Sequence, residues 1–190
     1  MPSKRILLLT MLLMLAAVVT AQTKAVSSKK SAPAKSKQWK IQNAMSAAPA
    51  AIAKEATIVD QPAKEGGEMA TVRKGSNKWT CIPDDPSTPV NDPMCLDQNA
   101  MEWAKAWKTH ADPKLSSPGI GYMLQGGGSP SNTDPFAKSP PEGKKWMQEP
   151  PHLMLFGTKL DTKVYSTDPH SGPWIMWAGT PYEHLMVPVK

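Results

Sequence analysis

The chain has 190 residues, of which 22 are lysine or arginine and 16 are aspartate or glutamate, giving a formal net charge of +6. Eight of the basic residues lie among the first 40 positions, where no acidic residue occurs. The chain beyond position 40 therefore has 14 basic and all 16 acidic residues. It is therefore slightly acidic. Nucleic-acid-binding proteins gather basic side chains on a folded face, so this distribution argues against that function class.

The N-terminus has the three parts of a secretory signal. Lys4 and Arg5 form a short positive region, residues 6–19 are apolar apart from Thr10, and residues 19–21 are small enough for a signal-peptidase site. The apolar run is shorter than the about 20 residues that a membrane-spanning helix needs, and no later stretch reaches that length. We predict a signal peptide over residues 1–21, no transmembrane segment after its removal, and an exported protein, periplasmic or secreted.

Residues 22–40 are rich in lysine, serine, alanine and proline, and this composition predicts a disordered, lysine-rich tether. Six of the eight early basic residues lie in it, so weak contact with an anionic envelope surface is an alternative to a plain spacer. A lysine near such a surface contributes about 1 kcal/mol. The remaining residues, 41–190, have the length of one domain.

The two cysteines, Cys81 and Cys95, suit an oxidising compartment. An even number of cysteines in an exported chain predicts a structural disulfide, which here would close a loop of about 15 residues. The spacing is not Cys-x-x-Cys, so a redox-catalytic pair is not expected. We therefore predict a Cys81–Cys95 bridge that stabilises the fold.

The first part of the domain has weak signals for short elements. Residues 43–54 are alanine-rich and predict a short helix that begins near Ser46, with Ser46 as its N-cap. Residues 56–59 favour a strand. Residues 68–73 and 78–82 flank a Gly-Ser-Asn turn, a pattern typical of a β-hairpin.

The clearest helix is predicted over about 97–110. Asp97 is a suitable N-cap, and neither glycine nor proline follows before Pro113. Trp103 and Trp107 lie one helical turn apart with alanines at the same spacing, so they form one apolar stripe. We expect this stripe to pack in the core rather than to present the indole rings to a ligand.

The second half predicts strands. Its apolar runs are short and are separated by glycine, proline and repeated Asp-Pro turns. Strands outnumber helices, and no alternation of strand and helix appears. We therefore predict an α+β fold, a small single domain with a mostly antiparallel sheet and one main helix. The expected strands are 120–124, 153–156, 174–177 and 185–189.

Two segments of the second half repeat a His-x-Met pattern, at His152 with Met154 and at His184 with Met186. Residues i and i+2 share one face of a strand, so each pair would present an imidazole beside a thioether. Such soft ligands suit Cu(I), and on neighbouring antiparallel strands all four side chains could serve one ion. Residues 152–157 also resemble the His-x-Met strand of periplasmic copper chaperones. The resemblance covers only these six residues, and it implies copper binding.

Two further stretches invite a ligand and are better explained by turns. Oxygen-bearing side chains in and after the cysteine loop would suit Ca²⁺, but their spacing is not that of an EF-hand. Residues 126–129 form a glycine-rich stretch without the Gly-Lys-Ser/Thr of a phosphate-binding loop, so we expect a surface loop. The oxygen-bearing residues are Asp84, Asp85, Asn91, Asp92 and Asp97.

A rival hypothesis of another class rests on the aromatic residues of the last third. Trp174 and Trp177 fall on opposite faces of one predicted strand. One of them could therefore be exposed and stack on a carbohydrate or another envelope ligand. A secreted enzyme is the third alternative. The chain has no Gly-x-Ser-x-Gly nucleophile motif, and His110 and His170 fall at a helix end and in a turn. A binding or structural role is therefore favoured over catalysis.

Overall fold

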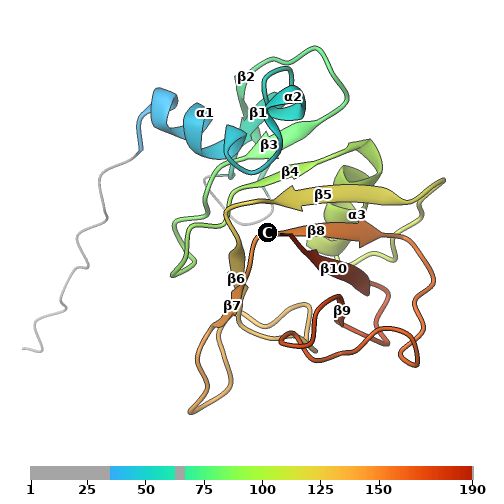
Figure 1. Cartoon of the computed structure of the whole chain (residues 1–190). Coiled ribbons are helices and arrows are strands. Elements are labelled where there is room, and N and C mark those ends of the chain that lie inside the picture. Colours follow the sequence, from blue (N-terminus) through green and yellow to red (C-terminus); the bar gives the residue numbers. More distant parts are fainter. Residues whose placement is uncertain (1–34, 63–66, 190) are drawn as a thin grey trace, which may run out of the picture. The chain divides into compact units, whose positions relative to one another are not determined.

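An eight-stranded sheet forms the centre of the computed structural model, which describes residues 35–62 and 67–189 (Figure 1). Its strands run in the order β2-β1-β3-β4-β5-β8-β10-β9, and each neighbouring pair is antiparallel except β1 with β3. β6 and β7 pair separately. The elements are α1 Lys37–Met45, α2 Ala50–Ala53, β1 Thr57–Asp60, β2 Ala70–Arg73, β3 Thr80–Ile82, β4 Met94–Leu96, α3 Gln98–Lys108, β5 Gly119–Met123, β6 Gly127–Ser129, β7 Met147–Glu149, β8 His152–Phe156, β9 Trp174–Met176 and β10 His184–Pro188.

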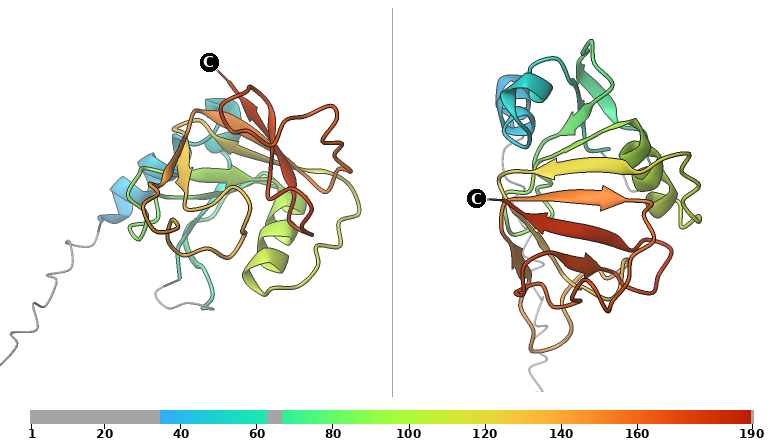
Figure 2. Two further views of the ribbon diagram at one scale, coloured as in Figure 1. Left: turned by 90° about the horizontal axis from the view of Figure 1, so that it is seen from below. Right: turned by 45° about the vertical axis from the view of Figure 1, so that its right-hand side comes forward.

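This architecture confirms the predicted α+β domain with a mostly antiparallel sheet. β5, β8, β10 and β9 lie side by side in the right-hand view of Figure 2, and α3 lies behind them. None of the helices in the described part of the chain is long and apolar enough to cross a membrane. The predicted signal peptide and residues 22–34 of the predicted tether lie outside the described residues, so export stays a prediction.

The main helix, α3, forms for the predicted reasons. The Asp97 side chain accepts a hydrogen bond from the backbone N–H of Ala100 at 2.8 Å and caps the helix. The other carboxylate oxygen accepts the N–H of Ile120 at 2.9 Å and so ties the helix start to β5. Helix and strand touch backbone to backbone, because a Cβ on Gly119 would lie 2.4 Å from the Ala100 nitrogen. Trp103 is buried on the inner side of this contact.

The disulfide is confirmed, and it joins neighbouring strands. Cys81 of β3 lies directly opposite Cys95 of β4, and the two are bridged. Both are fully buried under alanines of α1, α2 and their connection, with Trp79 and Tyr122 at the edge. Cys95 and Leu96 are consecutive, yet they belong to different apolar clusters, because successive strand residues point to opposite faces of the sheet.

Three predictions of local structure differ from the observed fold. Ser46 ends α1 as its C-cap instead of beginning a helix, and α1 includes residues 37–40, which composition assigned to the tether. The predicted hairpin is wrong, because β1 inserts between β2 and β3 and pairs with both. Residues 127–129, expected in a surface loop, form β6 and pair with β7. Local turn signals could not reveal pairing partners that lie elsewhere in the chain.

Candidate functional site

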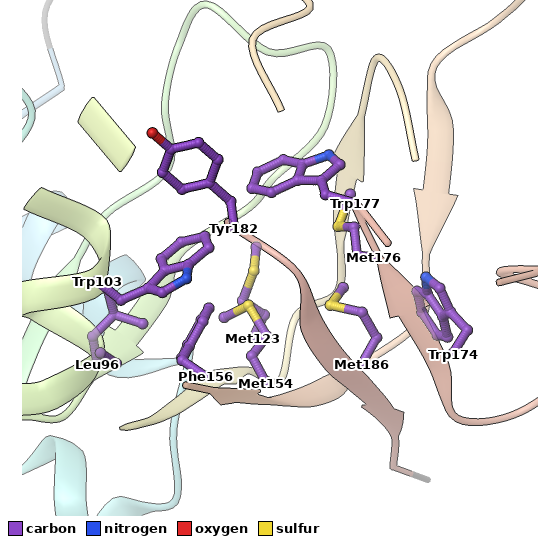
Figure 3. Packing of buried hydrophobic residues seen from close by; sticks show 11 residues of the cluster. Leu96, Trp103, Met123, Met154, Phe156, Trp174, Met176, Trp177, Tyr182 and Met186 are labelled. Carbon is purple, nitrogen blue, oxygen red and sulfur yellow. The ribbon is translucent and has the colours of Figure 1, made fainter. Parts of the chain in front are cut away.

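The methionines and histidines of the central strands line one face of the sheet, which we call the methionine face. Strand register arranges this face in three rows of directly opposed residues. α3 and the rings of Trp103, Trp177 and Tyr182 pack on it. Figure 3 shows the sulfur atoms of four methionines gathered there. The rows are Met123–His152–Pro188, then Gly121–Met154–Met186–Trp174, then Gly119–Phe156–His184–Met176.

His152 is the most unusual residue of the methionine face. Its side chain is fully buried, and Nδ1 lies 2.7 Å from the carbonyl oxygen of Pro150. A carbonyl can only accept, so Nδ1 carries the proton and Nε2 keeps its lone pair. Nε2 is buried and has no hydrogen-bond partner among the described residues. A buried acceptor left unpaired costs about 1–3 kcal/mol, so this atom lowers the stability of the fold unless a partner binds it.

His184 is held in the same way on β10. Its Nδ1 lies 3.0 Å from the carbonyl oxygen of Tyr182, again two residues earlier in the chain. The rings of Trp103, Trp177 and Phe156 surround the imidazole at centroid distances of 5.1, 5.2 and 5.1 Å. Burial, with a smaller contribution from His152, lowers the pKa of His184 to about 4 against the opposing effect of the hydrogen bond to Tyr182. Burial likewise lowers the pKa of His152. Both imidazoles are neutral at neutral pH.

The register divides the four predicted metal ligands instead of gathering them. Met154 and Met186 are directly opposed, as the copper hypothesis requires. His152 lies two residues from Met154 on β8, and His184 lies two residues from Met186 on β10. Because the strands are antiparallel, the two histidines lie on opposite sides of the methionine pair. Four residues of strand span about 14 Å, so the two imidazoles cannot reach one ion at the ligand distance of about 2 Å. A single site with all four ligands does not fit this geometry.

Each histidine instead has another methionine beside it, one that the sequence analysis did not assign as a ligand. Met123 lies directly opposite His152, and Met176 lies directly opposite His184. Both are buried. Directly opposed Cα atoms are about 4.5–5.5 Å apart, which brings each thioether beside its imidazole. The alternation of the expected strands put these residues on a face, but only the pairing of β5 with β8 and of β9 with β10 shows which histidine each one meets.

Trp174 and Trp177 do not provide the exposed platform that the carbohydrate hypothesis needs. Trp174 is completely buried and Trp177 is 9% exposed. Trp177 lies just past the end of β9 with a φ of 55°, which breaks the strand alternation and turns its ring into the cluster around Trp103. The Trp103 and Trp177 rings are nearly parallel, 7° apart, with centroids 6.0 Å apart.

The acidic side chains of the cysteine loop serve the loop itself. Asp92 accepts the Asp85 N–H at 3.0 Å and the Thr88 hydroxyl at 2.7 Å, and its own N–H is bound by Asp84. Asp97 is the helix cap described above. No group of three or more His, Cys, Asp or Glu side chains that could hold a metal ion occurs within residues 35–62 and 67–189. The calcium hypothesis therefore gains no support from the described residues.

One buried carboxyl lies next to the methionine face. Glu149 of β7 is 8% exposed and accepts a hydrogen bond from the Ser129 hydroxyl at 2.5 Å. Burial and the nearby charge of Asp92 raise the pKa of Glu149 to about 7, against the opposing effect of the Ser129 hydrogen bond. Burial also raises the pKa of Asp92 to about 6. A Cβ on Gly127 would lie 2.8 Å from the Met123 methyl group and 3.1 Å from the Glu149 carboxylate, so the glycine leaves room for both side chains.

The donor set of the methionine face determines which ion it could bind. It offers neutral imidazole nitrogens and thioether sulfurs, and none of the residues in its three rows carries a charge at neutral pH. Soft neutral ligands of this kind favour Cu(I), whereas hard divalent ions prefer carboxylate and carbonyl oxygens. A monovalent ion also brings the smallest charge into an interior without a counterion.

Comparisons with protein-family models, with curated proteins and with solved structures found no match to this chain.

Proposed function

We propose that the protein binds Cu(I) outside the cytoplasm, with His152 as the principal ligand and Met123 and Met154 as its thioether partners. The observation that carries this proposal is the Nε2 atom of His152, which is buried, deprotonated and unpaired among the described residues. Metal-binding histidines commonly donate the other ring N–H to a backbone carbonyl, as Nδ1 does here toward Pro150.

The strand register that brings two thioethers beside His152 supports this choice of partners. Met123 lies opposite His152 on β5, and Met154 follows two residues later on the same face of β8. Gly121, the residue opposite Met154, leaves room for the Met154 methyl group, which lies 2.8 Å from where a Cβ would be. A side chain at position 121 would displace Met154, so glycine here permits a methionine to lie flat across the strand.

The cellular location in this proposal comes from the sequence. The predicted signal peptide and the Cys81–Cys95 disulfide both suit an oxidising, extracytoplasmic compartment. Cysteine thiols that form disulfides in such a compartment can no longer bind copper, so other soft ligands are needed there. Both cysteines are bridged, so thioethers and imidazoles are the soft ligands that remain available in the described part of the chain.

The test is a Cu(I) competition titration against a chromophoric chelator, with ascorbate as a reductant that leaves the disulfide intact. The wild type is expected to remove Cu(I) from the chelator. His152→Leu removes the ligand atom and keeps an apolar side chain of similar bulk. We expect it to weaken binding by on the order of 100-fold or more, since removing even an outer partner of a metal ligand costs 10–100-fold.

The matched control is His170→Leu, because His170 is located in an exposed segment outside the methionine face. It should bind as tightly as the wild type. Met123→Leu and Met154→Leu conserve volume and should weaken binding while the thermal melt changes little. Failure of the wild type to compete with the chelator, or unchanged affinity in a folded His152→Leu variant, would overturn the proposal.

A further inference from the structure

The methionine face has a local twofold symmetry, and the proposed copper site occupies only one of its two related halves. The axis passes between the directly opposed Met154 and Met186 of the antiparallel strands β8 and β10. Rotation about it carries Met154 onto Met186, and therefore carries His152, two residues earlier, onto His184. The repeated His-Leu-Met sequence of the two strands is the trace of this symmetry in the chain.

The flanking strands obey the same symmetry. β5 lies outside β8 and β9 lies outside β10, both antiparallel to their neighbours. The rotation therefore carries Met123, opposite His152, onto Met176, opposite His184. The hydrogen bonds correspond as well, because each imidazole Nδ1 bonds the carbonyl of the residue two positions earlier. Ligand types, positions and ring tautomer are thus all repeated.

We infer that His184, Met176 and Met186 form a second site for a soft monovalent ion, so that the protein binds two such ions on one sheet face. This inference rests on the proposed Cu(I) function and adds a second site to it. Each site then consists of one imidazole, the methionine opposite it and the methionine two residues later. The two central methionines lie between the sites and belong to one site each.

The symmetry is broken in two respects, and both predict different affinities. Of the two histidines, only His152 has an Nε2 among the buried, unpaired atoms of the described residues. Gly121 is opposite Met154 in the first site, whereas Trp174 is opposite Met186 in the second. Trp174 is completely buried, and its Nε1 donates to Asn132 at 3.2 Å, which fixes the ring. Met186 therefore has less freedom to turn toward an ion than Met154 has. The His184 site should be the weaker of the two.

Repulsion between the ions acts in the same direction. The histidine positions are about 14 Å apart along the strands, and each ion would lie inward of its histidine, toward the central methionines. At an effective dielectric constant of about 20, the repulsion between two such charges weakens binding of the second ion by roughly tenfold or more. Two sequential binding steps are therefore expected, the first at His152 and the second at His184.

The experiment is a titration with Ag(I), a soft monovalent ion that needs no reductant, followed by native mass spectrometry of the full mature chain. The wild type should bind two ions. His184→Leu should bind one, His152→Leu should bind one, and the double variant none. Met176→Leu keeps His184 and the volume of the core and should weaken only the second step, by tenfold or more. His170→Leu, the exposed control, should bind two.

The outcomes separate this inference from the proposed function. No ion on the wild type overturns both. One ion that is lost in His152→Leu and retained in His184→Leu supports the proposed function and overturns the second site. One ion that is lost in His184→Leu and retained in His152→Leu overturns both assignments. Should His184→Leu fail to fold, Met176→Leu still decides, because an unchanged second step in that variant refutes the site.

Discussion

Glu149 offers a stability test that does not depend on any ligand. The side chain, on β7, is buried, its hydrogen-bond donor is the Ser129 hydroxyl of β6, and Asp92 lies nearby. Glu149→Gln keeps the size of the side chain and an oxygen that can accept from Ser129. It removes only the capacity to ionise.

The magnitude follows from the pKa. Burial raises the pKa of Glu149 from 4.5 to about 7. Below pH 4.5 the carboxyl is protonated in both states, and between pH 4.5 and 7 the folded state holds the proton more tightly. Stability from this group is therefore present at low pH and lost as pH rises through 7, by about 3 kcal/mol in total. For a domain of this size that loss lowers Tm by roughly 6–12 °C.

The two buried histidines give the free energy of unfolding a pH dependence of the opposite sign. Burial lowers the pKa of both His152 and His184 below 6.5 in the folded state. The unfolded chain therefore binds more protons than the folded one as pH falls through 6.5, and stability is lost on acidification. In the wild type alone, the pH dependence of stability combines the contributions of Glu149 and of the two histidines. The difference between the wild type and Glu149→Gln isolates the carboxyl, because the histidines are common to both.

The assay is urea unfolding followed by tryptophan fluorescence, for both proteins, at pH 5, 6, 7 and 8. The free energy of unfolding of the wild type should fall relative to that of Glu149→Gln as the pH rises, most steeply between pH 5 and 7, and the difference should level off by pH 8. Glu142→Gln, at an exposed position, is the control and should run parallel to the wild type. A difference between the wild type and Glu149→Gln that stays constant from pH 5 to 8 would refute the reasoning.

Three further predictions concern the framework that holds the site. Replacing Cys81 and Cys95 by serine opens a loop with a sequence separation of 14 and should cost about 3 kcal/mol, measured by urea unfolding without reductant. Gly119→Ala places a methyl group 2.4 Å from the Ala100 nitrogen, so a loss of about 1–3 kcal/mol is expected in thermal melts; an unchanged Tm would contradict the close contact of α3 with β5. Asp97→Ala leaves two backbone N–H groups without their acceptor and should cost about 2 kcal/mol, with Asp97→Asn less harmful.

The sequence predicted elements well where the signal is local. The helix that begins after Asp97 follows from a cap and an apolar stripe, and the strands around residues 120–124, 153–156 and 185–189 follow from short apolar runs between turns. The predicted hairpin failed for the complementary reason. The Gly-Ser-Asn turn joins its flanking segments in sequence, but β1 supplies a better partner to both, and no local pattern encodes that choice.

The sequence by itself determined four of the six residues of the candidate sites. Two His-x-Met pairs on apolar strands specify an imidazole and a thioether on one face of each strand, because side chains alternate along a strand. The disulfide follows from the number of cysteines and the predicted export. Neither conclusion needs the fold.

Only the tertiary structure decided how these residues combine. Strand register opposes the two central methionines and separates the histidines, and the outer strands bring Met123 and Met176 opposite them. Burial then removes the water that would pair His152 Nε2 and holds both imidazoles neutral. Register and burial depend on contacts between segments that are distant in the chain. Local patterns therefore identify the two His-x-Met pairs, and packing adds the other two methionines and determines which residues can share an ion.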